Sequence, residues 1–93
     1  MAYGAVSVTD SATLIVAANA RRHSLILSNE QGGAKAWLGP DSSVTITTGI
    51  PFYIGTNWDA DSGGVKIYCG DIYGIAASGN TANIRYWERT DYR

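Results

Sequence analysis

Residues 13–29 read TLIVAANARRHSLILSN, and this stretch decides the fold. Two short apolar runs, LIVA at 14–17 and LIL at 25–27, contain β-branched residues and stand on either side of a polar break. Short runs of this kind, bounded by turn-forming residues, are typical of strands joined by a tight turn. We therefore predict a central hairpin here, with Arg21 and Arg22 exposed at or just past its turn.

The remainder of the chain repeats this alternation of short apolar segments and turn signals. The turn signals come about every 8–12 residues, and no window shows helical periodicity. This pattern predicts an all-β fold, either a small antiparallel β-sandwich or a jelly-roll-like barrel of about eight short strands. Besides the hairpin, we expect strands at 3–9, 34–38, 44–47, 50–54, 65–69, 72–77 and 82–89, and an exposed polar loop at 55–64.

With 93 residues, the chain has room for one domain, which we place at 1–93. Segment 1–9 alternates apolar and polar residues, with Val6 and Val8 on one side. It is predicted to be either an edge strand or an arm that exchanges with a neighbouring chain. Tyr3, Val6 and Val8 are therefore predicted partner contacts. Pro51 predicts that segment 50–54 lies at a sheet edge, because proline cannot donate a ladder hydrogen bond.

The composition limits the classes of partner. Charged residues make up 16% of the chain, below the roughly 25% of typical domains. This low charge fits a surface covered by other protein, and equally a small β-protein rich in Thr, Ser and Asn. The net charge of −1 argues against binding to nucleic acid, because no basic excess is present to neutralise phosphates. No apolar run approaches the roughly 20 residues that span a bilayer, so we expect no membrane association.

No motif predicts catalysis. The single His23 and the single Cys69 are expected to have structural roles, and a nucleophile elbow is absent from the sequence. One His and one Cys do not supply the ligand spacing of a zinc site. Loops this short leave little material for a sugar cleft, although Asp59, Asp61 and Asp71 are formal candidates for glycoside hydrolysis. We therefore predict that the chain is not an enzyme and has no catalytic, cofactor or metal site.

The polar loop has some features of a calcium site. Residues 57–63 read NWDADSG and place oxygen donors at alternate positions. A calcium loop needs its Gly one position earlier and a bidentate Glu where Tyr68 stands. A solvated turn is therefore the preferred interpretation.

Aromatic residues are the strongest sign of a contact surface. The chain has three Trp and six Tyr but one Phe, and Trp and Tyr are enriched at protein interfaces. Trp58, in the polar loop, and Tyr92, in the C-terminal tail, are the two that a core does not explain. The remaining candidates are Tyr53, Tyr73, Tyr86 and Trp87.

A second surface pattern lies in the last predicted strand. Arg85, Trp87 and Arg89 alternate along it and therefore share one face. Such a stripe binds an anionic or acidic partner, or is simply a solvated strand face. Both interpretations stay open at this point.

Several short motifs together resemble a known group of proteins. They are IVAANARR at 15–22, LILSN at 25–29, AWLG at 36–39, VT at 44–45 with TGIP at 48–51, DIYGIAASG at 71–79 and ANIR at 82–85. This arrangement resembles small β-sandwich proteins encoded in the structural-gene regions of bacteriophages, of the capsid decoration (cement) or head-fibre type. The resemblance implies a virion component on the capsid surface, made in the host cytoplasm. It also implies the major capsid protein as partner and a homo-oligomer, with a trimer favoured.

The expected function is accordingly a non-enzymatic decoration protein that binds the outer shell and stabilises it. Modest contacts at each copy would sum through avidity on a repetitive lattice. Two alternatives remain open. One is a carbohydrate-binding module that contacts host glycans through Trp58, Asp59 and Asp61, and the other is a tail or baseplate subunit.

Overall fold

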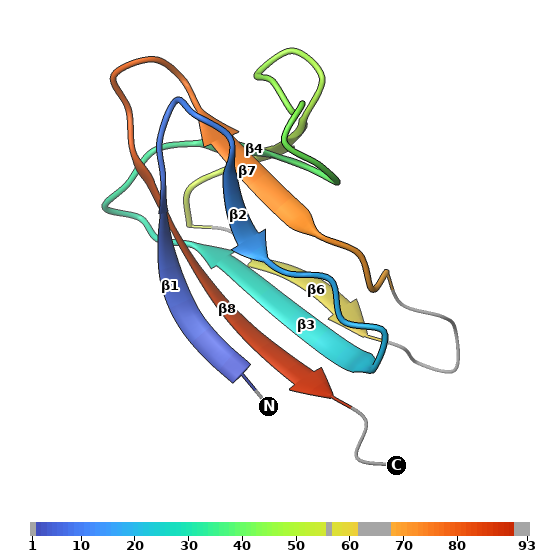
Figure 1. Cartoon of the computed structure of the whole chain (residues 1–93). Helices are drawn as coiled ribbons and strands as arrows, with labels where there is room; N and C mark the ends of the chain where they lie inside the picture. Colours follow the sequence, from blue (N-terminus) through green and yellow to red (C-terminus); the bar gives the residue numbers. More distant parts are fainter. Residues whose placement is uncertain (1, 56, 62–67, 91–93) are drawn as a thin grey trace.

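The computed structural model describes residues 2–55, 57–61 and 68–90. Within them the chain forms eight strands and no helix (Figure 1), which confirms the predicted all-β fold. Every strand pair is antiparallel. The strands are β1 (Ala2–Val8), β2 (Thr13–Val16), β3 (Arg22–Asn29), β4 (Ala36–Gly39), β5 (Ile50–Phe52), β6 (Asn57–Asp61), β7 (Ile72–Ala76) and β8 (Ala82–Thr90).

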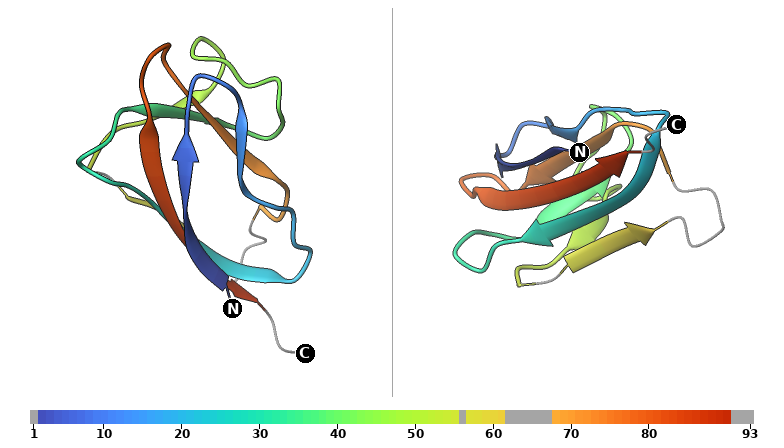
Figure 2. Two further views of the ribbon diagram at one scale, coloured as in Figure 1. Left: turned by 60° about the vertical axis from the view of Figure 1, so that its left-hand side comes forward. Right: turned by 90° about the horizontal axis from the view of Figure 1, so that it is seen from below.

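The described strands form two sheets with the strand order of a jelly roll. One sheet has the order β1-β8-β3-β6 and the other β2-β7-β4-β5. The pairs are β1 with β8, β2 with β7, β3 with β6 and β4 with β5, which is the nested pairing of a jelly roll. The pairs β3–β8 and β4–β7 join these nested pairs into the two four-stranded sheets. The sheets face each other as an open sandwich and do not close into a barrel (Figure 2).

The predicted central hairpin is wrong. β2 pairs with β7, whereas β3 lies in the opposite sheet between β8 and β6. The turn itself forms, because the N–H of Arg22 donates to the carbonyl of Asn19 at 3.0 Å. It carries the chain from one sheet to the other instead of joining two paired strands. The predicted exposure of Arg22 is also wrong, since its side chain is buried.

The core follows from strand alternation on the two inner faces. Leu25 and Leu27 of β3 and Ile84 of β8 are buried from one sheet, and Val8 of β1 joins them. The opposite sheet supplies its own inner side chains to the same cluster: Ile15, Val16, Ala36, Phe52 and Ile72. Because side chains alternate along a strand, the residues between these core positions face outward.

The polar side chain of Asn29 lies inside this core. Asn29, at the end of β3, is fully buried. Its Nδ2 donates to the carbonyls of Ala34 at 3.1 Å and Phe52 at 2.9 Å. The backbone carbonyl of Asn29 accepts from the N–H of Gly55 at 2.8 Å. Asn29 therefore connects the end of β3 with the loop before β4 and with β5 in the other sheet.

Two further predicted elements are wrong. Residues 44–47 do not form a strand. A turn covers 46–48, and the Thr45 hydroxyl accepts from the N–H of Thr48 at 3.1 Å, which satisfies the backbone locally. Conversely, part of the predicted polar loop is strand β6, which pairs with β3. Of the predicted strand 65–69, residues 65–67 lie outside the described part of the chain, and Tyr68 and Cys69 are not in a strand.

Two other predictions are confirmed. Pro51 lies in β5 at the edge of its sheet. Segment 1–9 contains an edge strand, β1, paired along its length with β8. Exchange of this segment with a neighbouring chain stays a prediction. Among the described residues, no helix is long and apolar enough to cross a membrane.

Candidate functional site

An apolar stripe crosses the outer face of the sheet β1-β8-β3-β6. Tyr3 of β1 stands opposite Trp87 of β8, which in turn stands opposite Ile26 of β3. Directly opposed residues in an antiparallel sheet share a face and lie within contact range of each other. All three side chains are exposed, Tyr3 by 82%, Trp87 by 48% and Ile26 by 39%. We call Tyr3, Trp87 and Ile26 the outer stripe.

The outer stripe is a direct consequence of the buried core behind it. In β3 the triplet Leu25–Ile26–Leu27 is apolar throughout, and both leucines face inward. Alternation then forces Ile26 to the solvent side. The same rule places Trp87 outward, because its neighbour Glu88 is buried. Ile26 and Trp87 are therefore exposed while their neighbours Leu25, Leu27 and Glu88 stay buried.

Cationic side chains flank the outer stripe. Arg85 and Arg89 lie two residues on either side of Trp87 and are both exposed, so the predicted Arg–Trp–Arg face is confirmed. The Arg85 Nη2 lies 3.1 Å from an Oε of Glu30, and both side chains remain largely exposed. Surface ion pairs of this kind contribute little to stability. The positive charge beside the stripe is thus partly balanced, and both guanidinium groups remain accessible to a partner.

A shallow hollow of about 270 Å³ accompanies the stripe. It lies beside Tyr3, Ile26, Arg85 and Trp87. The hollow gives the face some relief, although it is too open to enclose a small molecule. The arrangement suits a broad contact with another macromolecule.

The opposite sheet carries a smaller aromatic group. The Nζ of Lys35 lies 4.8 Å from the ring centre of Trp37 and 4.4 Å from that of Tyr53. A cation between two rings is attracted by both π faces. This contact joins the residues before β4 to those after β5 and accounts for Lys35 structurally.

An apolar cavity of about 440 Å³ lies at the β5 side of the sandwich. Its walls include Leu38, Pro51, Phe52, Ile72 and Tyr68. The described residues that line this cavity are mostly apolar.

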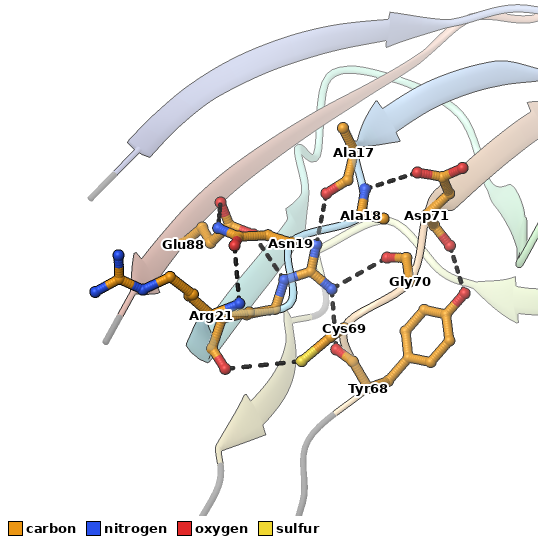
Figure 3. Close-up of polar contacts among 10 residues, drawn as sticks. Ala17, Ala18, Asn19, Arg21, Tyr68, Cys69, Gly70, Asp71 and Glu88 are labelled. Carbon is orange, nitrogen blue, oxygen red and sulfur yellow. Dashed lines mark hydrogen bonds and ion pairs between the residues drawn. The ribbon is translucent and has the colours of Figure 1, made fainter. Parts of the chain in front are cut away.

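A dense polar cluster surrounds the buried Arg22 side chain, and Figure 3 labels its partners Ala17, Tyr68, Gly70 and Glu88. The Arg22 Nε donates to Glu88 Oε2 at 2.7 Å, and the two side chains are 0% and 8% exposed. Nη1 donates to the carbonyls of Tyr68 at 2.9 Å and Gly70 at 3.2 Å. Nη2 donates to the carbonyl of Ala17 at 2.9 Å. We call Arg22 with these four acceptors the Arg22 lock.

Neighbouring residues complete this cluster. Asn19 donates from Nδ2 to Glu88 Oε1 at 3.4 Å, and its N–H donates to the carbonyl of Cys69 at 2.8 Å. The Cys69 thiol faces the carbonyl of Arg22 at 3.8 Å. Asp71 accepts the N–H of Ala18 at 2.6 Å. These groups bond one another or the backbone, so the cluster ties the β2–β3 crossover to β8 and to the segment before β7.

The residues weighed in the sequence as candidates for chemistry differ in exposure and contacts. His23 is exposed on β3, and Cys69 is half-buried beside the Arg22 backbone. Among the described residues, no three His, Cys, Asp or Glu side chains gather in a way that could hold a metal ion. Asp71 is engaged with the backbone, and the side chains of Asp59 and Asp61 lie outside the described set.

The predicted partner contacts divide into three kinds. Tyr3 is in the outer stripe, whereas Val6 packs against the core and Val8 is fully buried in it. Trp58 lies in β6 with its backbone opposite Leu27, and its side chain is outside the described set. Tyr92 also lies outside the described residues. Sequence reasoning missed Ile26, although an apolar triplet in a half-buried strand signals that its middle residue faces outward.

We compared the chain with known protein families, curated proteins and solved structures. Neither the scan against protein-family models nor the searches of curated proteins and of solved structures finds a match to this chain.

Proposed function

We propose that this chain is a non-enzymatic structural protein that binds another protein through the outer face of the sheet β1-β8-β3-β6. The outer stripe carries the proposal. Three large apolar side chains from three adjacent strands are exposed side by side. Single exposed apolar residues are ordinary on a surface, whereas a contiguous group rimmed by polar residues marks an interaction site.

The composition of this face supports a protein as the partner. Tyr, Trp and Arg are the residues that most often dominate protein–protein binding energy, and the face has all three. Its arginines are partly balanced by Glu30, and the chain carries a net charge of −1. A nucleic acid would call for a basic excess, which this chain does not have.

The resemblance described above supplies the proposed identity of the partner. It points to the outer shell of a bacteriophage capsid, where the chain would act as a decoration protein that binds and stabilises the major capsid protein. The jelly-roll strand order occurs in viral capsid domains and in lectins alike, so the fold favours neither alternative. The outer stripe is what favours a protein surface.

The proposed mechanism follows from the geometry of this face. Trp87, at the centre of the stripe, packs into an apolar depression on the shell, with Tyr3 and Ile26 excluding water around it. Arg85 and Arg89 lie at the rim, where they meet carboxylates and orient the contact. Each contact is small, and many copies on one lattice hold neighbouring capsid subunits together.

Co-sedimentation with assembled empty shells of the phage that encodes this chain tests the proposal. The parent chain should sediment with the shells in stoichiometric amounts. Trp87→Ala should weaken binding about 30-fold, as expected for a central aromatic contact worth about 2 kcal/mol. Ile26→Ser should weaken it less. The matched control is Ile46→Ser, which makes the same change at an exposed residue of the 44–49 loop.

Two outcomes contradict the proposal. Absence of the parent chain from the shell pellet removes the capsid as partner. Binding to a glycan array that is abolished by Trp58→Ala, with Trp87→Ala unaffected, supports the carbohydrate-binding alternative instead.

A further inference from the structure

Three of the four sheet edges carry features that hinder pairing with another chain. β6 reads NWDAD and carries two aspartates. β5 has three residues, one of which is Pro51. β2 has four residues, with an irregular register between Leu14 and Val16. Charge, proline, short length and irregularity are the devices by which natural sheets block edge-to-edge association.

The fourth edge, β1, has none of these devices. It reads AYGAVSV, with no proline and no charged residue. Its seven residues pair with β8 in unbroken register, from Ala2 opposite Glu88 to Val8 opposite Ala82. No described strand pairs with its other side. Every second residue of such a strand presents its N–H and C=O to the open side, ready to accept another strand.

We propose that two copies of this chain associate edge to edge through β1, as an antiparallel pair about a two-fold axis beside Ala5. This centre is the one that pairs all seven residues of β1. It places Ala5 opposite Ala5, Gly4 opposite Val6, and Tyr3 opposite Ser7 of the second copy. Opposed residues share a face, so the two four-stranded sheets become one continuous sheet.

The side chains of β1 suit this self-pairing. Outward-facing Tyr3 is large and 82% exposed, and it would lie over Ser7 and Ala5 of the second copy, which are small. No like charges meet across the joint. By contrast, the same pairing of β6 would place Asp59 opposite Asp59. A second copy is therefore the occupant that this edge fits best.

The pairing would also place two outer stripes on one face of the continuous sheet. This consequence rests on the proposed function, whereas the pairing itself does not. A bivalent unit binds a repetitive surface more tightly than a single copy, because the second contact becomes intramolecular.

Sedimentation velocity of the 93-residue chain tests the pairing. A seven-residue edge buries less than the roughly 1,600 Å² of a standard interface, so we expect a monomer–dimer equilibrium with a Kd of about 10–100 µM. The main variant is Ala5→Glu, which sets two carboxylates against each other across the axis. It should fold like the parent, because residue 5 is exposed and stands opposite Arg85. Its dimer should be at least about tenfold weaker.

A charge swap identifies the register. Ala5→Lys should also weaken the dimer, whereas an equimolar mixture of Ala5→Glu and Ala5→Lys should associate again, because opposite charges then meet at the axis. Ser78→Glu, which adds the same charge in an exposed turn, is the matched control and should leave the Kd unchanged.

The results that overturn the pairing are distinct from those that overturn the proposed function. A parent chain that stays monomeric up to about 1 mM, or that forms a trimer, contradicts edge pairing through β1. Failure of the mixture to associate contradicts the Ala5-centred register. Trp87→Ala should leave the dimer intact while weakening binding to shells, so the two proposals fail separately.

Discussion

Removal of Glu88 should be among the most damaging single substitutions in this protein. Among the described residues, its carboxylate is the anionic acceptor of the buried Arg22 guanidinium, at 2.7 Å. The Arg22 side chain is 0% exposed, so Glu88→Ala leaves a cation inside the sandwich without a counter-charge. Breaking a buried pair in this way typically costs about 3–5 kcal/mol.

This cost is large relative to the whole domain. The free energy of unfolding of natural proteins is roughly 0.05–0.15 kcal/mol per residue, which gives about 5–14 kcal/mol for a chain of this length. The double variant Arg22→Met/Glu88→Leu removes both charges and leaves the carbonyls of Ala17, Tyr68 and Gly70 without their donor. At about 1 kcal/mol for each orphaned carbonyl, the double variant should lose about 3 kcal/mol. The single variants Arg22→Met and Glu88→Leu each break the buried pair, and their losses should sum to at least about 6 kcal/mol.

Urea unfolding monitored by Trp fluorescence measures these differences. The matched control is Arg85→Ala, which breaks the exposed ion pair with Glu30 and should cost less than about 1 kcal/mol. If Glu88→Ala loses no more than Arg85→Ala, the reasoning is refuted. Additive losses in the double variant would likewise show that the Arg22 lock is not a coupled unit.

Two further predictions concern other polar groups. Asn29→Ala removes two buried hydrogen bonds, to the carbonyls of Ala34 and Phe52, and should lower the free energy of unfolding by about 2–4 kcal/mol in the same urea assay; an effect below 1 kcal/mol would contradict a bridging role. The Ser43 hydroxyl, and then the Ser43 N–H, donate to Asp41 and lower the pKa of its carboxyl below 3.8, so an NMR titration should find a midpoint below that value and Ser43→Ala should raise it. Because the pKa of Asp41 is lower in the folded state, its contact with Ser43 stabilises the fold at pH values above the unfolded-state pKa. This stabilisation is lost as the pH falls through the folded-state pKa.

Part of the outer stripe and its flanking arginines could be predicted from the sequence. Alternation along the last strand was enough to place Arg85, Trp87 and Arg89 on one exposed face. The apolar triplet around Ile26 carried the same kind of signal. Tyr3 reaches Trp87 only because β1 pairs with β8, and these strands are the first and last of the described chain. A local pattern specifies which side of a strand faces water, but it does not specify which strand lies next to it.

The alternation of short apolar segments and turns was sufficient by itself to predict an all-β fold and an edge position for Pro51, because these properties depend on neighbouring residues. The choice between a sandwich and a barrel needed the tertiary structure. The segment that looked like a central hairpin, residues 13–29, needed the tertiary structure. Its turn is local, but its strands go to opposite sheets because their hydrogen-bond partners, β7 and β8, come from the far end of the chain. The same holds for Arg22. Its position beside a turn predicted exposure. Burial of its charge became favourable only because Glu88 and the carbonyls of the distant segment at 68–70 converge on it, together with the nearby carbonyl of Ala17.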